Sequence, residues 1–385
     1  MLRIFLTSSP LSTLFMTVYA KKTHQNSTDI LLIDSVKKKE SLLKSIHDTA
    51  SFHQWDHVYN FSETIDDDTN LNPTILKKLT REFKTKPIVQ NIYNILYKIY
   101  LGRTTKTQTD KLNNTIKERS ENFSSVELNL LTETMLNSAL HDIFPNAKVN
   151  YFEHGVSDYF FATKKELHPG NFYCIFHEQL KLFLQKRGQP NDYVFPFFDG
   201  EEFEKISEHI LGKQEETSIV KNIGEQNDRL ALILLIDAER GYNVPKHFWK
   251  EFMDKCLAQI ADPQSFTFII KPHPFQSEEV IQIVKTYFTQ KGLKFHLLDH
   301  SIFINMSVEV IVSLWKDKLS HVFSSFSSAL FYLSMLYPFQ NIQYYYSYEF
   351  MLPYLNNADK QYRDLYLHHR ELIEEVFSVK CKQLQ

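Results

Sequence analysis

The sequence predicts an α/β protein of two lobes, each built on a mostly parallel sheet with helices on both faces. Short apolar runs rich in β-branched and aromatic residues alternate with segments of helical periodicity. The chain has 385 residues, which is too long for one ordinary core. A polar stretch at residues 212–228 interrupts the alternation. We therefore expect one lobe at residues 1–212, a second at residues 213–385, and a cleft between them.

The first lobe is expected to begin with a strand, a turn and a helix, rather than with a signal peptide. Residues 2–6 are apolar, but the sequence Thr-Ser-Ser-Pro at residues 7–10 interrupts the run before the helical segment 11–19. Further strands are predicted at residues 29–34, 57–61, 147–152 and 193–198, and helices at residues 35–47, 73–83, 87–100, 126–143 and 201–211.

The second lobe is predicted to start with the strongly apolar strand 229–236. Its most informative segment is a buried strand at residues 266–270 that stops at Lys-Pro-His-Pro, after which Ser277 and two glutamates begin a helix. Further strands are predicted at residues 294–298, 302–305, 321–323 and 341–346, and helices at residues 244–260, 308–315 and 329–336, with a long amphipathic helix at 359–379.

Composition narrows the class of protein. With 43% hydrophobic and 23% charged residues the chain is an ordinary globular protein, and a net charge of −3 argues against nonspecific nucleic-acid binding. The three cysteines show neither metal-binding spacing nor a disulfide framework, and no run of 18 apolar residues is present. We therefore expect a cytoplasmic protein. The nine glycines form neither a dinucleotide-binding fingerprint nor a P-loop.

His273 is predicted to lie at the carboxyl end of a strand and just before a helix, where open α/β sheets bind ligands. Pro272 and Pro274 restrict the backbone on both sides of it. Lys271 and the free amides at the start of the helix favour an anion. Taken alone, the motif is equally compatible with a stiff connector between strand and helix.

Four serines occur among residues 324–328, at a predicted strand end and helix start. A helix N-cap needs only one serine, whereas several hydroxyls with free amides can bind a phosphate. Glu309 lies on a nearby predicted helix among apolar residues, where it suits either the two hydroxyls of a ribose or simple solvation. With His273 and Lys271, these residues predict a phosphate site without a metal cluster.

A third loop, Glu153-His154-Gly155, follows the predicted strand 147–152. A carboxylate at the end of an apolar strand, facing a cleft, can have a raised pKa and act as a general base. Gly155 permits a tight turn directly after it. Taken alone, this loop is better explained as a surface turn. A base in one lobe and a phosphate site in the other is nevertheless the layout of a two-domain sugar transferase.

The order of these motifs resembles the bacterial sialyltransferases of the GT-B type, which include the lipooligosaccharide sialyltransferases and the capsule polysialyltransferases. In that family an [Asp/Glu]-[Asp/Glu]-Gly motif supplies the base, His-Pro contacts the phosphate of CMP, and Ser-Ser/Thr binds the same phosphate. Residues 151–155 are similar to the first motif, with His154 in place of the second acid. Residues 271–274 are similar to the second motif and residues 326–330 to the third.

Two further positions extend the resemblance along the chain. Residues 7–11, which include Ser9, are similar to the first strand–helix turn of the family, and Glu309 lies where related enzymes have a glutamate that binds ribose. The resemblance implies two Rossmann-like lobes and inverting transfer of sialic acid from CMP-sialic acid to a hydroxyl of a bacterial surface glycan, either capsule polysialic acid or lipooligosaccharide. It implies no metal and no other cofactor.

The resemblance also implies roles for individual residues. Glu153 would deprotonate the acceptor, and His273 would hydrogen-bond or protonate the departing phosphate. The donor-binding residues would be Lys271, Pro274, Glu309, Ser327 and Ser328, and those near the acceptor or the cleft would be His154, Gly155 and Ser9.

Two alternatives remain at this point: another CMP- or UDP-sugar transferase of capsule biosynthesis, and a noncatalytic protein that binds nucleotides or glycans. The sequence also suggests peripheral association with the inner membrane. Basic residues gather at 37–39 and 77–86, where they would attract anionic headgroups or an anionic glycan. A solvated helix face is the more common explanation of either segment alone.

Overall fold

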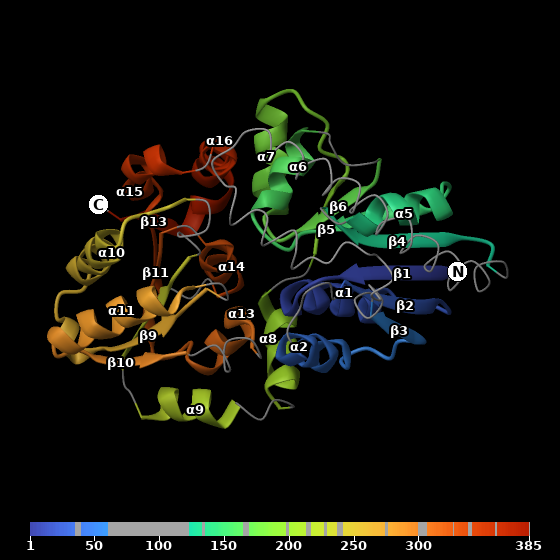
Figure 1. The fold of residues 1–385 in the computed structure, drawn as a ribbon. Coiled ribbons are helices and arrows are strands. Elements are labelled where there is room, and N and C mark those ends of the chain that lie inside the picture. Colours follow the sequence, from blue (N-terminus) through green and yellow to red (C-terminus); the bar gives the residue numbers. More distant parts are fainter. Residues whose placement is uncertain are drawn as a thin grey trace, which may run out of the picture.

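The computed structural model describes residues 1–34, 40–60, 123–132, 135–164, 169–197, 200–212, 217–226, 229–236, 242–273, 276–298, 306–325, 327–337, 341–358 and 360–384. These residues form two sheets in separate lobes (Figure 1). The predicted α/β architecture of two Rossmann-like lobes is confirmed, because every strand pair among the described residues is parallel.

The sheet of the first lobe has the strand order β3-β2-β1-β4-β5-β6-β7. All residues of β1 are buried, as are five of the six residues in β2. Burial on both faces explains why these strands are continuous apolar runs in the sequence. The strands are β1 (Leu2–Thr7), β2 (Thr28–Ile33), β3 (His57–Asn60), β4 (Val126–Leu131), β5 (Lys148–Phe152), β6 (Asn171–Cys174) and β7 (Val194–Pro196), and the helices are α1 (Pro10–Thr23), α2 (Glu40–Ala50), α5 (Met135–Ile143), α6 (Ser157–Lys164), α7 (His177–Lys186) and α8 (Gly200–Leu211).

The single helix predicted at residues 126–143 is wrong. The first part is strand β4, which lies between β1 and β5, and the helix α5 is confined to the second part. The strand escaped detection because its polar residues Glu127 and Asn129 are buried as well. Glu127 accepts a hydrogen bond from Lys148 at 3.1 Å, and Asn129 accepts one from Asn150 at 2.9 Å. Pairing across the sheet thus satisfies polar groups where an apolar pattern is expected.

The sheet of the second lobe has the order β10-β9-β8-β11-β12-β13. Its central strand β8 is completely buried. The strands are β8 (Leu230–Leu234), β9 (Thr267–Lys271), β10 (Lys294–Leu297), β11 (Leu319–Ser324), β12 (Gln343–Tyr346) and β13 (Cys381–Gln383), and the helices are α9 (Thr217–Glu225), α10 (His247–Ala258), η1 (Pro263–Ser265), α11 (Glu278–Gln290), α13 (Val308–Ile311), η2 (Val312–Leu314), α14 (Ser328–Leu336), α15 (Tyr348–Met351), η3 (Leu352–Asn357), α16 (Lys360–His368), α17 (Arg370–Leu372), η4 (Ile373–Phe377) and η5 (Ser378–Lys380).

The stretch at residues 212–228 is not a plain polar linker, because it contains helix α9. The polar composition hides two buried residues, Val220 and Ile223, and the indole of Trp315 donates a hydrogen bond to the Val220 carbonyl at 3.0 Å. The preceding helix α8 packs against α13 and α14 of the second lobe. In the sequence, strands β1 to β7 precede this segment and strands β8 to β13 follow it. The exact domain boundary, between residues 212 and 213, stays a prediction.

The long terminal helix predicted at residues 359–379 is also wrong. The segment forms α16 and α17, then a π-helical turn η4 and a 3₁₀ turn η5, and ends in strand β13. A straight helix would carry the chain away from the sheet, whereas these turns bring β13 into parallel pairing with β12. On the way, the ring of Phe377 packs against Tyr159 of the first lobe at 4.7 Å, and Arg187 forms an ion pair with Glu375 at 2.7 Å. The end of the chain therefore joins the two lobes.

Several predictions fall outside the described residues. These are the helices at residues 73–83 and 87–100, the strand at 302–305, Pro274, and the basic segments at 37–39 and 77–86. The three cysteines are free thiols. Among the described residues, no helix is both long enough and apolar enough to cross a membrane.

Candidate active site

The strand order of the second sheet brings two predicted loops together. The order reverses at β8, which lies between β9 and β11. In such sheets, ligands bind at the carboxyl ends of the strands beside this point. Lys271 ends β9 and Ser324 ends β11, so the loops that carry His273 and the serines both begin at this edge.

The start of helix α11, after β9, has the predicted form. The Ser277 side chain accepts a hydrogen bond from the Val280 amide at 3.3 Å and caps α11, as the sequence indicates. The carbonyl of His273 accepts a hydrogen bond from the Gln276 amide at 2.9 Å. Pro272 is buried and His273 is partly exposed. The backbone is therefore anchored while the imidazole still has access to solvent.

Lys271 and Glu309 are electrostatically coupled in this region. Burial lowers the pKa of Lys271 to about 8, and the negative charge of Glu309 opposes the shift. Glu309 itself is only 5% exposed and accepts a hydrogen bond from the Ser307 hydroxyl. Its backbone carbonyl is held by the hydroxyl of Tyr337 at 2.9 Å. Glu309 is thus a fixed, enclosed carboxylate rather than the solvated helix residue that the sequence left possible.

Two of the four serines are bonded to the neighbouring structure, Ser324 through its hydroxyl and Ser325 through its backbone carbonyl. Ser324 donates to the Leu234 carbonyl at 3.2 Å, and the carbonyl of Ser325 accepts from the Ser347 amide at 3.1 Å. Ser327 occupies the N-cap of α14 without a capping bond from its side chain. Within the described part of the chain, neither its hydroxyl nor that of Ser328 has a hydrogen-bond partner. Both hydroxyls therefore remain available for a ligand at the amino end of α14.

Glu153 is completely buried directly after β5, not exposed on a surface turn. One carboxylate oxygen accepts a hydrogen bond from the Ile175 amide, and the other accepts one from the Tyr332 hydroxyl at 3.0 Å. Burial raises the pKa of Glu153 to about 8, and hydrogen bonds from Tyr159, Ile175 and Tyr332 limit the rise. A raised pKa at this position is what the sequence leads us to expect of a general base, and the role of Glu153 as that base stays a prediction.

Tyr332 connects this carboxyl group to the second lobe. It lies on α14, one helical turn after Ser328, so both residues lie on the same side of that helix. Its ring is fully buried against Phe15 and Phe176 of the first lobe, with ring centroids 6.3 Å apart in each case. The sequence did not single out Tyr332, because a tyrosine in an apolar helix carries no distinctive signal.

Asp158 is a second acid that the sequence did not single out. One carboxylate oxygen accepts hydrogen bonds from the backbone amides of His154 at 2.6 Å and Gly155 at 2.9 Å. The other oxygen accepts one from the Thr132 hydroxyl, and the imidazole of His154 lies 3.1 Å from the same carboxylate. Asp158 thus holds the loop that follows Glu153 in place.

Ser9, predicted to lie near the acceptor or the cleft, acts as the N-cap of α1. Its hydroxyl accepts a hydrogen bond from the Ser12 amide at 3.1 Å, and the Ser12 hydroxyl bonds back to the Ser9 amide at 2.9 Å. This reciprocal capping box stabilises the helix start. Whether Ser9 also touches a ligand stays a prediction.

Comparison with known proteins adds family evidence to this geometry. A sequence profile described as alpha-2,8-polysialyltransferase (POLYST) matches residues 3–346. No curated protein sequence matches the chain. The fold is similar to that of UDP-GlcNAc 2-epimerase from Methanocaldococcus jannaschii, with a TM-score of 0.50 and 11% identity over 99% of this chain and 88% of that chain. A sialyltransferase from Photobacterium damsela gives a TM-score of 0.49 and 10% identity, over 100% of this chain and 81% of that chain. At 11% identity, the first likeness concerns the fold alone, which is the expected GT-B arrangement of two Rossmann-like domains.

Proposed function

The chain belongs to the alpha-2,8-polysialyltransferase family and is a glycosyltransferase, and from this premise we propose that it transfers sialic acid from CMP-sialic acid to a hydroxyl of a bacterial surface glycan. The proposed reaction inverts the configuration at the anomeric carbon and requires no metal. The observation that supports it best is the hydrogen bond between Glu153 and Tyr332. It joins the proposed base of one lobe to the helix whose amino end carries Ser327 and Ser328.

In the proposed mechanism, the acceptor oxygen attacks the anomeric carbon of sialic acid while the bond from that carbon to the CMP phosphate breaks. Glu153 takes the proton of the acceptor hydroxyl. The electron pair of the broken bond leaves with the phosphate, to which His273 donates a hydrogen bond or a proton. Ser327 and Ser328, with the amides at the start of α14 and the charge of Lys271, stabilise the departing phosphate.

Burial of Glu153 imposes one condition on this mechanism. The Tyr332 hydroxyl occupies one of its carboxylate oxygens, so the acceptor hydroxyl must replace that of Tyr332. We propose that α14 moves when donor and acceptor bind, because the same helix carries the phosphate-binding serines. Tyr332 would then couple binding of the donor in the second lobe to the release of Glu153 in the first.

Incubation of the purified protein with CMP-sialic acid tests the proposal. The acceptor panel should contain lactose-ended glycans and oligosialic acids, and the product should be identified by mass. We expect release of CMP coupled to elongation of one acceptor class. Turnover with a UDP-sugar and none with CMP-sialic acid would instead indicate a different sugar transferase. Tight CMP binding without transfer or donor hydrolysis would indicate a binding protein.

The pH dependence should reflect the raised pKa of Glu153. Since the base must be ionised, kcat/KM should increase with pH up to about 8 and then level off. Tyr332→Phe removes a hydrogen bond that lowers this pKa, so the rise should shift to higher pH. Steady-state kinetics between pH 5.5 and 9.5, an interval of about 4 units around that pKa, measures both profiles. A variant profile shifted to lower pH would contradict the assignment.

Activity should survive removal of divalent metal. The proposed charge stabilisation at the phosphate comes from Lys271, His273, two serine hydroxyls and backbone amides. Transfer should therefore proceed at the same rate after dialysis against EDTA. Complete loss with chelator, followed by recovery with Mg²⁺ or Mn²⁺, would contradict this phosphate site.

We also propose peripheral association with the inner face of the cytoplasmic membrane. The support is the basic sequence at residues 37–39 and 77–86, which lies outside the described residues. Each such charge near an anionic membrane contributes about 1 kcal/mol. Part of the protein should sediment with membranes at low salt and be released by about 0.5 M NaCl, because screening is then strong. Protein that stays in the supernatant at low salt, or that requires detergent for release, would disprove the proposal.

A further inference from the structure

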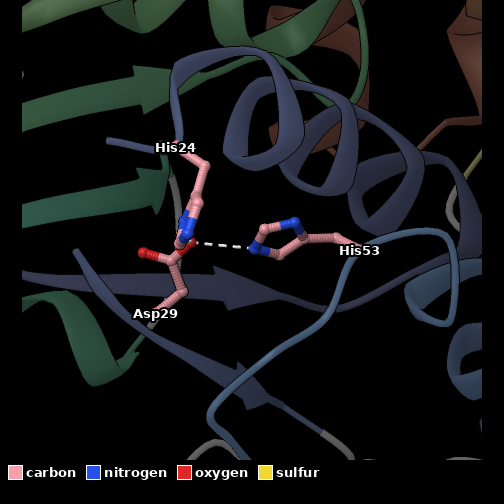
Figure 2. A group of neighbouring side chains, drawn as sticks. All are labelled: His24, Asp29 and His53. Atoms are coloured by element: carbon pink, nitrogen blue, oxygen red, sulfur yellow. Dashed lines mark hydrogen bonds and ion pairs between the residues drawn. The ribbon is translucent and has the colours of Figure 1, made fainter. Parts of the chain in front are cut away.

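Two histidines and an aspartate converge at the edge of the first sheet that is remote from Glu153. His24 follows α1, Asp29 is the second residue of β2, and His53 lies between α2 and β3. Both imidazole rings point at the carboxylate (Figure 2). His24 Nδ1 lies 3.1 Å and His53 Nε2 lies 2.8 Å from the same oxygen, Asp29 Oδ2.

We propose that His24, Asp29 and His53 form a binding site for a Zn²⁺ ion. The three candidate ligand atoms all lie within 4.8 Å of one another. In a tetrahedral zinc site with bonds of about 2.0 Å, neighbouring ligand atoms are about 3.3 Å apart. Small side-chain movements would therefore bring all three atoms into contact with one ion. Two imidazoles and one carboxylate suit zinc, whereas magnesium and calcium prefer ligand sets made of oxygen.

The carboxylate is held as a metal-binding group requires. Arg3 Nε donates to Asp29 Oδ1 at 2.7 Å, and Ser27 donates to the same oxygen at 2.9 Å. The backbone amide of Asp29 donates to Asp56 at 2.7 Å. Asp29 is fully buried on a strand, so neither its backbone nor its side chain is free to turn away. Hydrogen bonds of this kind orient carboxylates that bind metals.

Arg3 is also the main obstacle, since its Nη2 atom approaches Asp29 Oδ2 at 2.5 Å. The structure offers a way around it, because Nη2 also donates to the Ala20 carbonyl at 3.2 Å and Nη1 donates to the Thr23 hydroxyl at 2.6 Å. Arg3 can retain Oδ1 and these two acceptors while Oδ2 is transferred to the ion. The nearby positive charge will weaken binding, so the site should be weaker than a structural site made of four protein ligands.

An ion can enter from solvent and keep an open coordination position. His24 is 46% exposed, whereas His53 is 7% exposed. Both rings line a surface cavity of about 600 Å³, whose wall also includes Gln54 and Asp56. Three protein ligands leave room for a water molecule on the cavity side.

The site is separate from the proposed active site. In the sheet register, Asp29 is level with Arg3, which is level with Glu127 and in turn with Lys148. Glu153 lies five residues further along the chain from Lys148, or roughly 16 Å along the strand direction. Bound zinc would therefore link the end of α1, the start of β2 and the segment before β3 without touching the donor or the acceptor.

The test is a titration of the full-length, EDTA-treated protein with Co²⁺ as a visible probe and then with Zn²⁺ by calorimetry. We expect one equivalent of each metal to bind per chain. Bound Co²⁺ should show the absorption bands of a site with low coordination number, and these bands should disappear when zinc is added. Zinc should also raise the melting temperature, because it binds the folded state. None of these measurements depends on transfer activity, so failure here is separate from failure of the proposed function.

His24→Ala is the decisive variant because its ring is largely exposed and its removal should not disturb the core. Zinc affinity should fall at least about tenfold. The matched control is His247→Ala, another exposed histidine, whose ring lies 3.9 Å from Glu251, and it should bind like the wild type. Equal affinity in His24→Ala and wild type, or no zinc binding by the wild type, would overturn the proposal.

Discussion

Replacing Glu153 with glutamine should lower the turnover number for transfer by about a hundredfold to ten-thousandfold, the usual contribution of a general base. Glutamine has nearly the same shape and can retain one acceptor for the Ile175 amide, so the buried site should stay folded. Glu153 lies in the first lobe, whereas the proposed phosphate site lies in the second. The affinity for CMP should therefore remain close to that of the wild type, as measured by calorimetry beside the kinetic assay.

A matched control separates loss of the base from damage to a buried polar group. Glu127 is 5% exposed and belongs to the same sheet, but it lies near the opposite edge and bonds to Lys148 and Asn129. Glu127→Gln should reduce stability and leave the turnover number of the folded enzyme nearly unchanged. If Glu153→Gln transfers within a few-fold of the wild type, Glu153 is not the base. If both variants lose the same activity, the loss comes from the fold.

The sequence predicted most of the fold because parallel strands buried on both faces leave an unambiguous apolar pattern. Strands β1, β2, β8 and β9 were placed within one or two residues of their observed ends. Prediction failed where buried polar residues pair across strands, as in β4, and where tertiary contacts decide the path, as after residue 359. Neither kind of information is present in the periodicity of a single segment.

The candidate site could be predicted only in part, for a related reason. Residues on strand-end loops, such as His273 and Ser327, have sequence signals because the loop chemistry is local. Tyr332 and Asp158 matter through what they contact: Tyr332 reaches Glu153 across 179 positions of the chain, and Asp158 folds back on its own loop. His24, Asp29 and His53 come from three separate segments and have no common spacing. Contacts of this kind are determined by the fold.

The second large effect is expected at His273. His273→Ala should lower the turnover number by about a hundredfold or more, because proton donation to a leaving group contributes on that scale. It should also weaken donor binding, since the imidazole would contact the phosphate before the bond breaks. His296→Ala is the control, because it removes another partly buried imidazole from the neighbouring strand β10. This control should change neither the turnover number nor the donor dissociation constant strongly.

The combination with the serines tests whether these residues act on one phosphate. Ser327→Ala with Ser328→Ala should also reduce turnover and donor affinity, because two hydroxyls that have no partner among the described residues would no longer bind the ligand. When His273→Ala is added, the combined loss should be smaller than the product of the separate losses, since groups that act on one ligand are not independent. The measurements are kcat and the donor dissociation constant. They are made for the wild type, the His273→Ala variant, the variant with both serine substitutions, and the variant with all three substitutions. Full additivity would mean that the loop after β9 and the start of α14 bind different ligands, and the site assembled at the edge beside β8 would have to be divided.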